Sequence, residues 1–354
     1  MNAPILKIFI PLTISFLTGL AITPTLTTFL YKHKLWKKKV RSVGIDGKAT
    51  PIFSNLHKDK EVGTPRMGGI VIWGSTLITT LIFFGLAQVD HNSILERFSF
   101  LSRNQTWLPF ISLIAGSLVG LIDDILHVAE NEGHAVGGGG LSLAKRLAAV
   151  LVIGLIGGWW FYAKLGNSTL WFPFEGQIYV GLWMIPLFML VMIAMYSGTV
   201  IDGLDGLSGG IFTIMYASYS LIAFYQTQYD IAALCAVIAG ATLAFLWFNI
   251  PPARFYMTET GTLGLTITLA VIAFLTDTVP VLVFIGFPLL AESGSDIIQL
   301  LSKKFRGGKK VFLVAPIHHH FEALGWPSYK VTMRFWIVGI ITSIMGIVVA
   351  IAGK

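Results

Sequence analysis

The sequence is poor in charge and in cysteine. Charged residues make up 12% of its 354 residues, about half of the roughly 25% that is typical of a soluble domain. The single cysteine, Cys235, lies within an apolar run, so a framework of internal disulfides is excluded. Hydrophobic residues reach 55%. These values exclude a soluble globular domain and indicate an all-α, polytopic integral membrane protein.

Long apolar windows recur along the whole chain. A membrane-spanning helix needs about 20 apolar residues, and we expect about ten such helices in a single domain over residues 1–354. The first window is too long for the apolar core of a signal peptide, about 7–15 residues, so we expect a retained helix. The expected spans are 6–30, 67–88, 107–126, 144–164, 180–200, 208–226, 230–248, 261–277, 279–301 and 333–352.

The basic residues predict how these spans are oriented. Residues 31–66 contain ten Lys and Arg, and residues 302–334 contain seven more. Because basic loops stay on the cytoplasmic side, both segments are expected to be cytoplasmic, with both termini outside. With alternating loops, 20 of the 25 basic residues then fall inside. The net charge of +7 is explained by this topology and by attraction to anionic lipid, and it requires no nucleic acid.

Polar motifs are expected to gather on that same cytoplasmic side. They are Gly63 to Gly69, Asp123-Asp124, the run Asp202-Gly203-Leu204-Asp205-Gly206, the segment Asn249 to Glu259, and the triplet His318-His319-His320. Five such motifs on one face suggest a shared active site, because polar clusters near a bilayer are costly unless they have a function.

The acidic motifs are typical of a site for a hard cation. Asp123 and Asp124 repel each other unless a proton or cation lies between them, and Mg²⁺ commonly takes one or two carboxylates plus substrate phosphates. A pair of solvated acids at a helix end is the simpler alternative. Asp202 and Asp205 share a face if they lie on a helical turn, although the run could equally be a plain turn between helices.

Glu259 and the histidines also allow more than one interpretation. Glu259 precedes an apolar span, where it could bind a metal or act as a capping acid near a helix N-terminus. Pro251 and Pro252 must end the helix before it. Three adjacent histidines cannot all face one metal from a regular helix, so phosphate contact, proton transfer or hydrogen bonding suits them better. An interfacial polar loop is the alternative.

Together these motifs resemble the phospho-N-acetylmuramoyl-pentapeptide transferases, within the polyprenyl-phosphate N-acetylhexosamine-1-phosphate transferase superfamily. The resemblance runs from Gly63 to Trp336 and is most specific at Ala315 to Glu322. It implies a bacterial plasma-membrane enzyme with a cytoplasmic Mg²⁺ site, usually a homodimer. It also implies transfer of phospho-MurNAc-pentapeptide from UDP-MurNAc-pentapeptide to undecaprenyl phosphate, giving lipid I and UMP.

The resemblance assigns roles to individual residues. Glu259, with Asp202 beside it, would hold Mg²⁺, and Asp123 or Asp124 would orient or deprotonate the lipid phosphate. Asp205 and Asn249 would hold the nucleotide end. The catalytic residues implied are Asp123, Asp124, Asp202, His318, His319 and His320, and the substrate-binding residues are Lys60, Thr199, Asp205 and Asn249.

The chain departs from the family pattern at several positions. Glu259 stands where the family has an aspartate, and His127 where it has a lysine. Tyr196 and Thr199 replace two asparagines, and the lysine after Gly-Leu-Ser corresponds to Lys145 or Arg146. Three alternatives therefore stay open: a related UDP-N-acetylhexosamine transferase, a catalytically impaired relative, and a transporter. A transporter should place its polar residues near the membrane midplane, whereas here they gather at one face.

Overall fold

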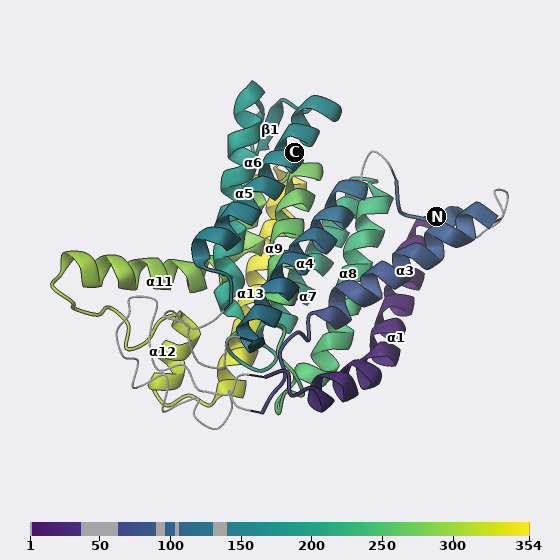
Figure 1. The fold of residues 1–354 in the computed structure, drawn as a ribbon. Coiled ribbons are helices and arrows are strands. Elements are labelled where there is room, and N and C mark those ends of the chain that lie inside the picture. The colour runs from purple at the N-terminus through teal and green to yellow at the C-terminus, as the bar shows by residue number, and fades with distance from the viewer. Residues whose placement is uncertain (1, 37–62, 90–95, 103–105, 130–139, 354) are drawn as a thin grey trace.

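The computed structural model describes residues 2–36, 63–89, 96–102, 106–129 and 140–353. Figure 1 shows a bundle of long helices with a few short elements at its two ends. The long helices are α1 (Asn2–Lys32), α3 (Ile70–Val89), α4 (Trp107–Ala129), α5 (Leu143–Trp159), α6 (Met184–Ser197), α7 (Leu207–Tyr225), α8 (Tyr229–Asn249), α9 (Thr258–Leu275), α11 (Phe287–Phe305) and α13 (Ser328–Ala352).

Short elements join these helices. They are the 3-10 turns Glu96–Phe98, Gly181–Trp183, Gly198–Ile201 and Val279–Val281, the π-helical turn Trp160–Lys164, and the short helices α10 (Leu282–Ile285) and α12 (Ile317–Ala323). Several of them extend a neighbouring helix, so that α5 and α6 become continuous apolar segments of 22 and 21 residues. Elements of that length can cross the hydrocarbon layer of a membrane.

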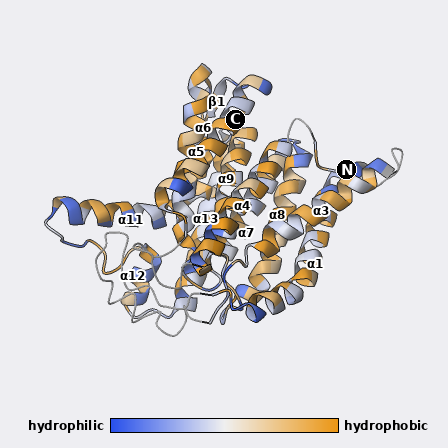
Figure 2. Ribbon diagram, in the orientation of Figure 1, coloured by the Kyte–Doolittle hydropathy of each residue, from blue (hydrophilic) through white to orange (hydrophobic). Residues whose placement is uncertain are grey.

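Within the described ranges, nine helices are long and apolar enough to span a membrane, or ten if one bent pair counts as a single span. Much of the ribbon of the bundle is orange, the colour of hydrophobic residues, in Figure 2. The prediction of an all-α polytopic protein with about ten spans is thus confirmed. The centre of the bundle is α9, where 89% of the apolar window is buried, whereas α1 and α13 lie at the periphery with 22% buried.

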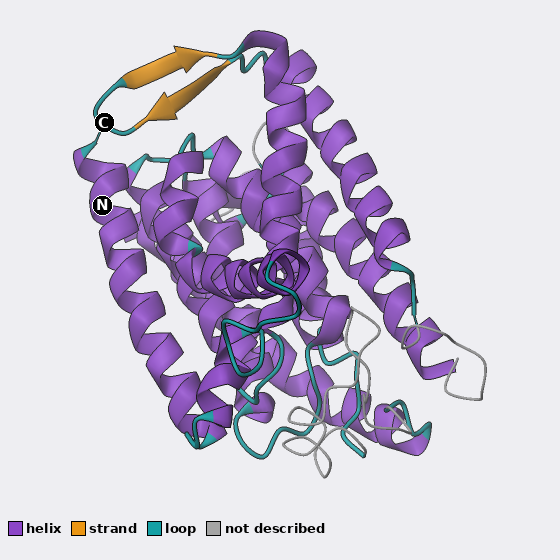
Figure 3. Cartoon of the chain, turned by 90° about the vertical axis from the view of Figure 1, so that its left-hand side faces the viewer, coloured by secondary structure: helices purple, strands orange, loops and turns teal. Residues whose placement is uncertain are grey.

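The expected span 279–301 is wrong as a single straight helix. Residues Val279–Ile285 and Phe287–Phe305 meet at Gly286 with a bend of 80°. As a result α11 leaves the bundle sideways in Figure 1 and points toward the viewer in Figure 3. Gly286 ends α10 and Pro288 lies in the first turn of α11, a pair that interrupts a continuous helix. Beyond the bend, Glu292 of α11 contacts His318 of α12.

A two-stranded hairpin interrupts the helical pattern between α5 and α6. Strand β1 (Thr169–Phe172) pairs antiparallel with β2 (Gly176–Tyr179), with Thr169 opposite Tyr179. Figure 3 places the hairpin and the C-terminus together at one end of the bundle, and the Phe174 N–H donates to the Gly353 carbonyl at 3.0 Å. The apolar windows of the sequence do not predict this hairpin, which is too short to change the fold class.

The opposite end of the bundle collects the polar motifs. Helices α4 and α8 end there and helices α3, α7 and α9 begin there, so their termini and loops converge (Figure 1). Close packing holds two of them together, because a Cβ on Gly120 of α4 would lie 2.0 Å from the carbonyl oxygen of Glu259 at the start of α9. Only glycine permits that approach, and it brings Asp123 and Asp124 beside Glu259.

Candidate functional site

Asp124 is the most completely bonded side chain of this end. Arg66 donates to its Oδ1 from Nη2 at 2.8 Å and from Nε at 3.1 Å. Its Oδ2 accepts from the hydroxyl of Thr258, from the Thr260 N–H at 3.0 Å and from the Thr260 hydroxyl at 2.5 Å. The carboxylate is fully buried. Asp124 therefore ties α4 to the first turn of α9 and to the segment before α3.

Asp123, the preceding residue, lies near a different arginine, Arg146. Arg146 of α5 lies between two acids, with Nη1 at 2.6 Å from Glu259 Oε1 and 4.0 Å from Asp123 Oδ2. The Leu141 N–H also donates to Asp123 Oδ1 at 2.6 Å. The buried Tyr196 ring lies within electrostatic range of both Glu259 and Arg146. Asp123 and Glu259 thus form a pair of carboxylates that share one guanidinium.

Asp202 connects the turn after α6 to the start of α9. Its Oδ1 accepts from the Ser208 hydroxyl at 2.6 Å, and its Oδ2 accepts from the Thr258 N–H at 2.7 Å. Burial raises the pKa of the Asp202 carboxyl, an effect that these two hydrogen bonds oppose. Thr258 has a positive φ of 56°, a conformation that is uncommon outside glycine. Its backbone and hydroxyl bonds to Asp202 and Asp124 hold it there.

The side chains of Asp205 and Asn249 form hydrogen bonds with backbone groups. Asp205 Oδ2 accepts from the Ala253 N–H at 3.2 Å. Asn249 Oδ1 accepts from the Gly206 N–H at 2.9 Å, and its Nδ2 donates to the Phe255 carbonyl at 2.9 Å. These bonds fix the turn 202–206 against the loop 250–257. Of the two interpretations of this run, the structure has the turn between helices, because residues 202–206 form turns before α7 and the two carboxylates have separate partners.

The triple histidine lies on the short helix α12. His318 Nδ1 is 2.7 Å from Glu292 Oε2, and His319 Nδ1 is 2.8 Å from Glu322 Oε2. His320 differs, because its Nδ1 accepts from the Leu313 N–H at 3.2 Å. His318 and His319 are buried and His320 is half-buried. As expected from their adjacency, the three rings face different partners.

A glycine brings two of these rings to the acidic turn. A Cβ on Gly203 would lie 2.2 Å from His318 Nε2 and 3.1 Å from His319 Nε2. The backbone between Asp202 and Asp205 therefore packs directly on the imidazoles, which explains why this position is glycine. The structure thus unites Asp123, Asp124, Asp202 and Glu259 through residues 258–260, and it adds His318 and His319 through Gly203.

The residues present suit a single Mg²⁺ that is shared with a substrate. In the described parts of the chain, no three His, Cys, Asp or Glu side chains are arranged to hold a metal by themselves. Mg²⁺ usually needs only one or two protein carboxylates when phosphates complete its shell. Glu259 meets that requirement, since its buried Oε2 has no hydrogen-bond partner among the described residues, and Asp123 faces the same guanidinium. Asp202 has both oxygens engaged, so it fits less well.

Two further residues were predicted to bind substrate. Lys60 lies outside the described residues. Thr199 belongs to the 3-10 turn before Asp202, and its carbonyl accepts from the Asp202 N–H at 3.3 Å. The roles assigned to all these residues from the sequence stay predictions, because geometry alone does not test them.

Sequence reasoning missed the partners of the acids. Arg66, Thr258, Thr260 and Glu322 were not assigned roles, and Arg146 was not distinguished from Lys145. A signal was present for Arg66, which lies inside the motif from Gly63 to Gly69. For the threonines the only signal was a run of three hydroxyl residues around Glu259, in Thr258-Glu259-Thr260-Gly261-Thr262.

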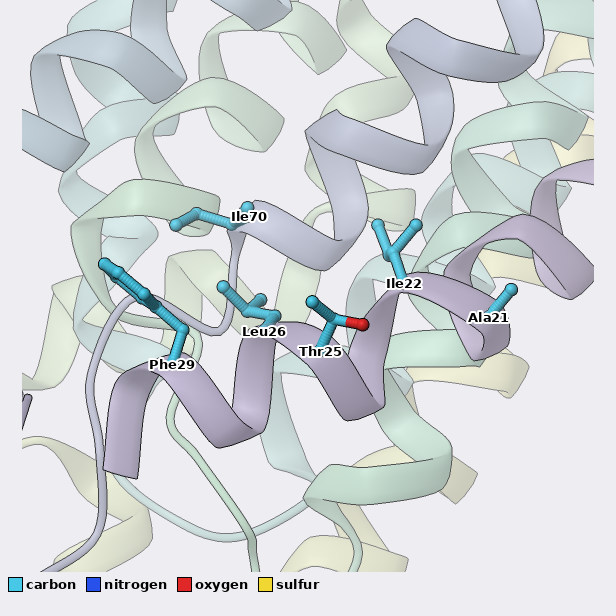
Figure 4. A pocket seen from close by; sticks show the side chains of 6 residues that line it. All are labelled: Ala21, Ile22, Thr25, Leu26, Phe29 and Ile70. Atoms are coloured by element: carbon cyan, nitrogen blue, oxygen red, sulfur yellow. The ribbon is translucent and has the colours of Figure 1, made fainter. Parts of the chain in front are cut away.

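An apolar surface groove lies elsewhere. It has a volume of about 530 Å³, lies between α1 and α3, and is open to the side of the bundle (Figure 4). Its lining is apolar except for one threonine and consists of Ala21, Ile22, Thr25, Leu26, Phe29 and Ile70. Because it contains no titratable side chain, it does not coincide with the polar cluster.

Comparisons with known proteins agree with the geometry. The model of glycosyl transferase family 4 matches residues 106–277. The phospho-N-acetylmuramoyl-pentapeptide-transferase of Geobacillus thermodenitrificans is 33% identical over 347 residues, covering 97% of this chain and 98% of that protein. The protein of the same name from Listeria monocytogenes is 33% identical over 299 residues, covering 83% and 86%.

A third relative of that name, from Bacillus pumilus, is 32% identical over 352 residues and covers 97% of this chain and 98% of its own length. The similarity therefore extends over nearly the whole chain rather than over one motif. Together with the helical membrane fold and the acidic and histidine clusters, these matches show that the chain belongs to the phospho-N-acetylmuramoyl-pentapeptide transferase family.

Proposed function

We propose that this protein transfers phospho-MurNAc-pentapeptide from UDP-MurNAc-pentapeptide to undecaprenyl phosphate, with lipid I and UMP as products. One observation carries the proposal: four carboxylates and two histidines meet at one end of a membrane bundle, in a chain whose relatives bear the name of this transferase. An anionic diphosphate donor and an anionic lipid phosphate both need positive charge and hydrogen-bond donors near the acids.

The two paired aspartates take different parts in this proposal. Asp124 has every oxygen engaged by Arg66, Thr258 and Thr260, so it positions the turn that carries Glu259. Among the described residues, Asp123 accepts a hydrogen bond from one N–H and stands 4.0 Å from Arg146, which leaves it able to accept a proton or orient the lipid phosphate. The attacking oxygen then forms a bond to the β-phosphorus of the donor as the bond to UMP breaks.

Glu259, with Asp123 facing it, would hold Mg²⁺. When bound, the ion neutralises charge on the diphosphate and on the departing UMP. Arg146 supplies a second positive charge to the same place. His318 and His319, oriented by Glu292 and Glu322, would direct their ring edges toward the turn 202–206 and stabilise phosphate or sugar oxygens by hydrogen bonds.

The proposed site faces the cytoplasm of a bacterial cell. The positive-inside distribution of Lys and Arg supports this orientation, and the soluble nucleotide donor must reach the polar end of the bundle from that side. The homodimer that the family resemblance implies stays a prediction.

The decisive experiment is UMP release by the purified protein in detergent. The assay contains undecaprenyl phosphate and UDP-MurNAc-pentapeptide, with and without Mg²⁺, and UDP-GlcNAc replaces the donor in a parallel series. We expect release that requires both the lipid and Mg²⁺. Release with UDP-GlcNAc alone would move the protein to a related branch of the superfamily. A folded sample that is silent with both donors would overturn the proposal.

A further inference from the structure

Helix α11 has an apolar stripe that no part of the described chain covers. Ile297, Ile298, Leu301 and Phe305 lie on one face at helical spacing, and all are exposed, with Phe305 at 74%. Figure 1 shows α11 projecting sideways from the bundle above α12, the helix that carries the histidines. A helix that leaves the bundle with its apolar face uncovered needs an apolar environment outside the protein.

The other face of α11 is polar and is covered by the returning chain. Gln299 accepts from the N–H groups of Val311 and Phe312 at 2.9 and 3.0 Å and donates to the Phe312 carbonyl at 2.8 Å. Ser302 donates to the Lys309 carbonyl at 2.9 Å. The helix is therefore amphipathic in a fixed orientation, with one face bonded to residues 309–312 and the other turned outward.

The far end of α11 is strongly basic. Residues 297–316 contain five basic residues and no acid, and the basic residues are Lys303, Lys304, Arg306, Lys309 and Lys310. Four of them are exposed, and Lys303 is partly buried. Figure 2 shows this end of α11 as the hydrophilic tip of an otherwise mixed helix. A glycine turn at Gly307 and Gly308, both with positive φ, folds the lysines of residues 309 and 310 back beside those of the helix.

An apolar stripe that ends in a cluster of lysine and arginine is the pattern of a helix lying in the membrane interface. Its apolar face enters the acyl region while the cations contact headgroups. We propose that α11 and the basic turn 303–310 form a binding surface for anionic phospholipids, in the leaflet at the same end as the polar cluster. The occupant is the negatively charged lipid surface, chosen by charge complementarity.

This surface is mechanically connected to the histidines. The segment bonded to Gln299 continues to Leu313, whose N–H donates to His320, and α11 itself carries Glu292, the partner of His318. Contact between lipid headgroups and the basic turn 303–310 would therefore fix the depth of α12 relative to the membrane surface. The inference rests on the placement of the helices in a bilayer, and it holds whichever donor sugar the protein uses.

The test is competition between lipids for the intact protein. Delipidated protein is mixed with equal amounts of phosphatidylglycerol and phosphatidylcholine, and the lipids retained are counted by native mass spectrometry. The variant K304Q/K309Q/K310Q removes three exposed charges from the tip. Its matched control, K32Q/K34Q/K330Q, removes three exposed lysines that lie elsewhere. A third variant, K304R/K309R/K310R, keeps the charge.

We expect wild type, the control and the arginine variant to prefer phosphatidylglycerol, and the glutamine tip variant to lose about tenfold of that preference. Equal preference in the tip variant and the control would overturn the proposal. So would displacement of phosphatidylglycerol by inorganic phosphate, which would indicate a small phosphate site instead. Melting temperatures measured in parallel show whether each variant is folded, and the arginine variant keeps the test decisive if the glutamine variant is not.

Discussion

At the scale of single residues, the site is organised around the first turn of α9. Glu259 is flanked by two threonines whose hydroxyls both bond Asp124. The turn that carries Glu259 is thus held from both sides. The Glu259 carboxylate reaches Arg146 of α5, so the turn and the arginine belong to one arrangement.

We call the hydrogen bonds of the Thr258 and Thr260 hydroxyls to Asp124 the clamp. This clamp predicts the effect of removing a single hydroxyl. In T260V the Asp124 carboxylate keeps Arg66 but loses a buried donor, which should lower the free energy of unfolding by about 1–2 kcal/mol. Turnover should fall as well, because the Glu259 turn is less firmly held. Thr262 provides the matched control, since it is equally buried and bonds only to the Thr258 carbonyl of its own helix.

Thermal shift and UMP release, measured on T260V and T262V side by side, check this prediction. Equal effects of the two substitutions would contradict a specific role for the clamp and would assign the loss to a change in local packing.

Arg146 predicts how the protein binds a divalent cation. Its guanidinium lies 2.6 Å from Glu259 and 4.0 Å from Asp123, so it competes electrostatically with any metal at these carboxylates. R146Q should therefore bind Mn²⁺ several-fold more tightly in the absence of substrate, while K145Q, altered at an exposed neighbour, should bind it as wild type does. Titration followed by electron paramagnetic resonance measures this affinity directly. Unchanged or weaker binding in R146Q would show that Arg146 supports the metal site.

At the scale of elements, apolar length and charge predicted most of what the structure contains. Nine of the expected spans appear near their expected positions, because about 20 apolar residues leave a helix few alternatives in a membrane. The bend at Gly286 was harder to predict from the sequence, since the window 279–301 is apolar enough to span a membrane. Gly286 and Pro288 mark where the helix can break, but the partner that holds α11 against α12 is His318, 26 residues from Glu292.

In the site, too, contiguous motifs could be predicted from the sequence, whereas contacts between residues far apart in the chain could not. Motifs such as Asp123-Asp124 and the histidine run were visible in the sequence because they are contiguous. Their partners were not, because Arg66 meets Asp124 across 58 residues and Arg146 meets Glu259 across 113. No periodicity encodes such pairs, which depend on how the helix ends converge.

The link between α11 and α12 yields a prediction at this scale. Gln299 makes three hydrogen bonds to residues 311 and 312, so Q299A should free that segment and loosen the histidine helix. We expect faster amide hydrogen exchange across residues 309–320 and reduced turnover, with little change in the bundle. Q228A is the control, because Gln228 makes one long bond of 3.4 Å at a distant helix end. Exchange that is unchanged in Q299A would contradict the link.

At the scale of the whole molecule, the bundle has two chemically different ends. The hairpin end holds the C-terminus and is closed by Asp277, which accepts from the Trp171 N–H at 3.0 Å and from Gln177. The other end holds the acids, the histidines and α11. A membrane enzyme with a soluble donor and a lipid acceptor needs such polarity, because both substrates must meet at a single interface.

This polarity makes the orientation directly measurable. Cys235 is buried, so we expect little labelling of the wild-type chain by a maleimide. Lys330 is exposed at the start of α13 on the histidine side, and Glu175 is exposed on the hairpin. If the site faces the cytoplasm, a membrane-impermeant maleimide should label E175C in intact spheroplasts and K330C only in inverted vesicles. The reverse pattern would place the acids and histidines outside the cell, where a nucleotide-linked donor is not supplied, and the proposed transfer could not be the function of the site.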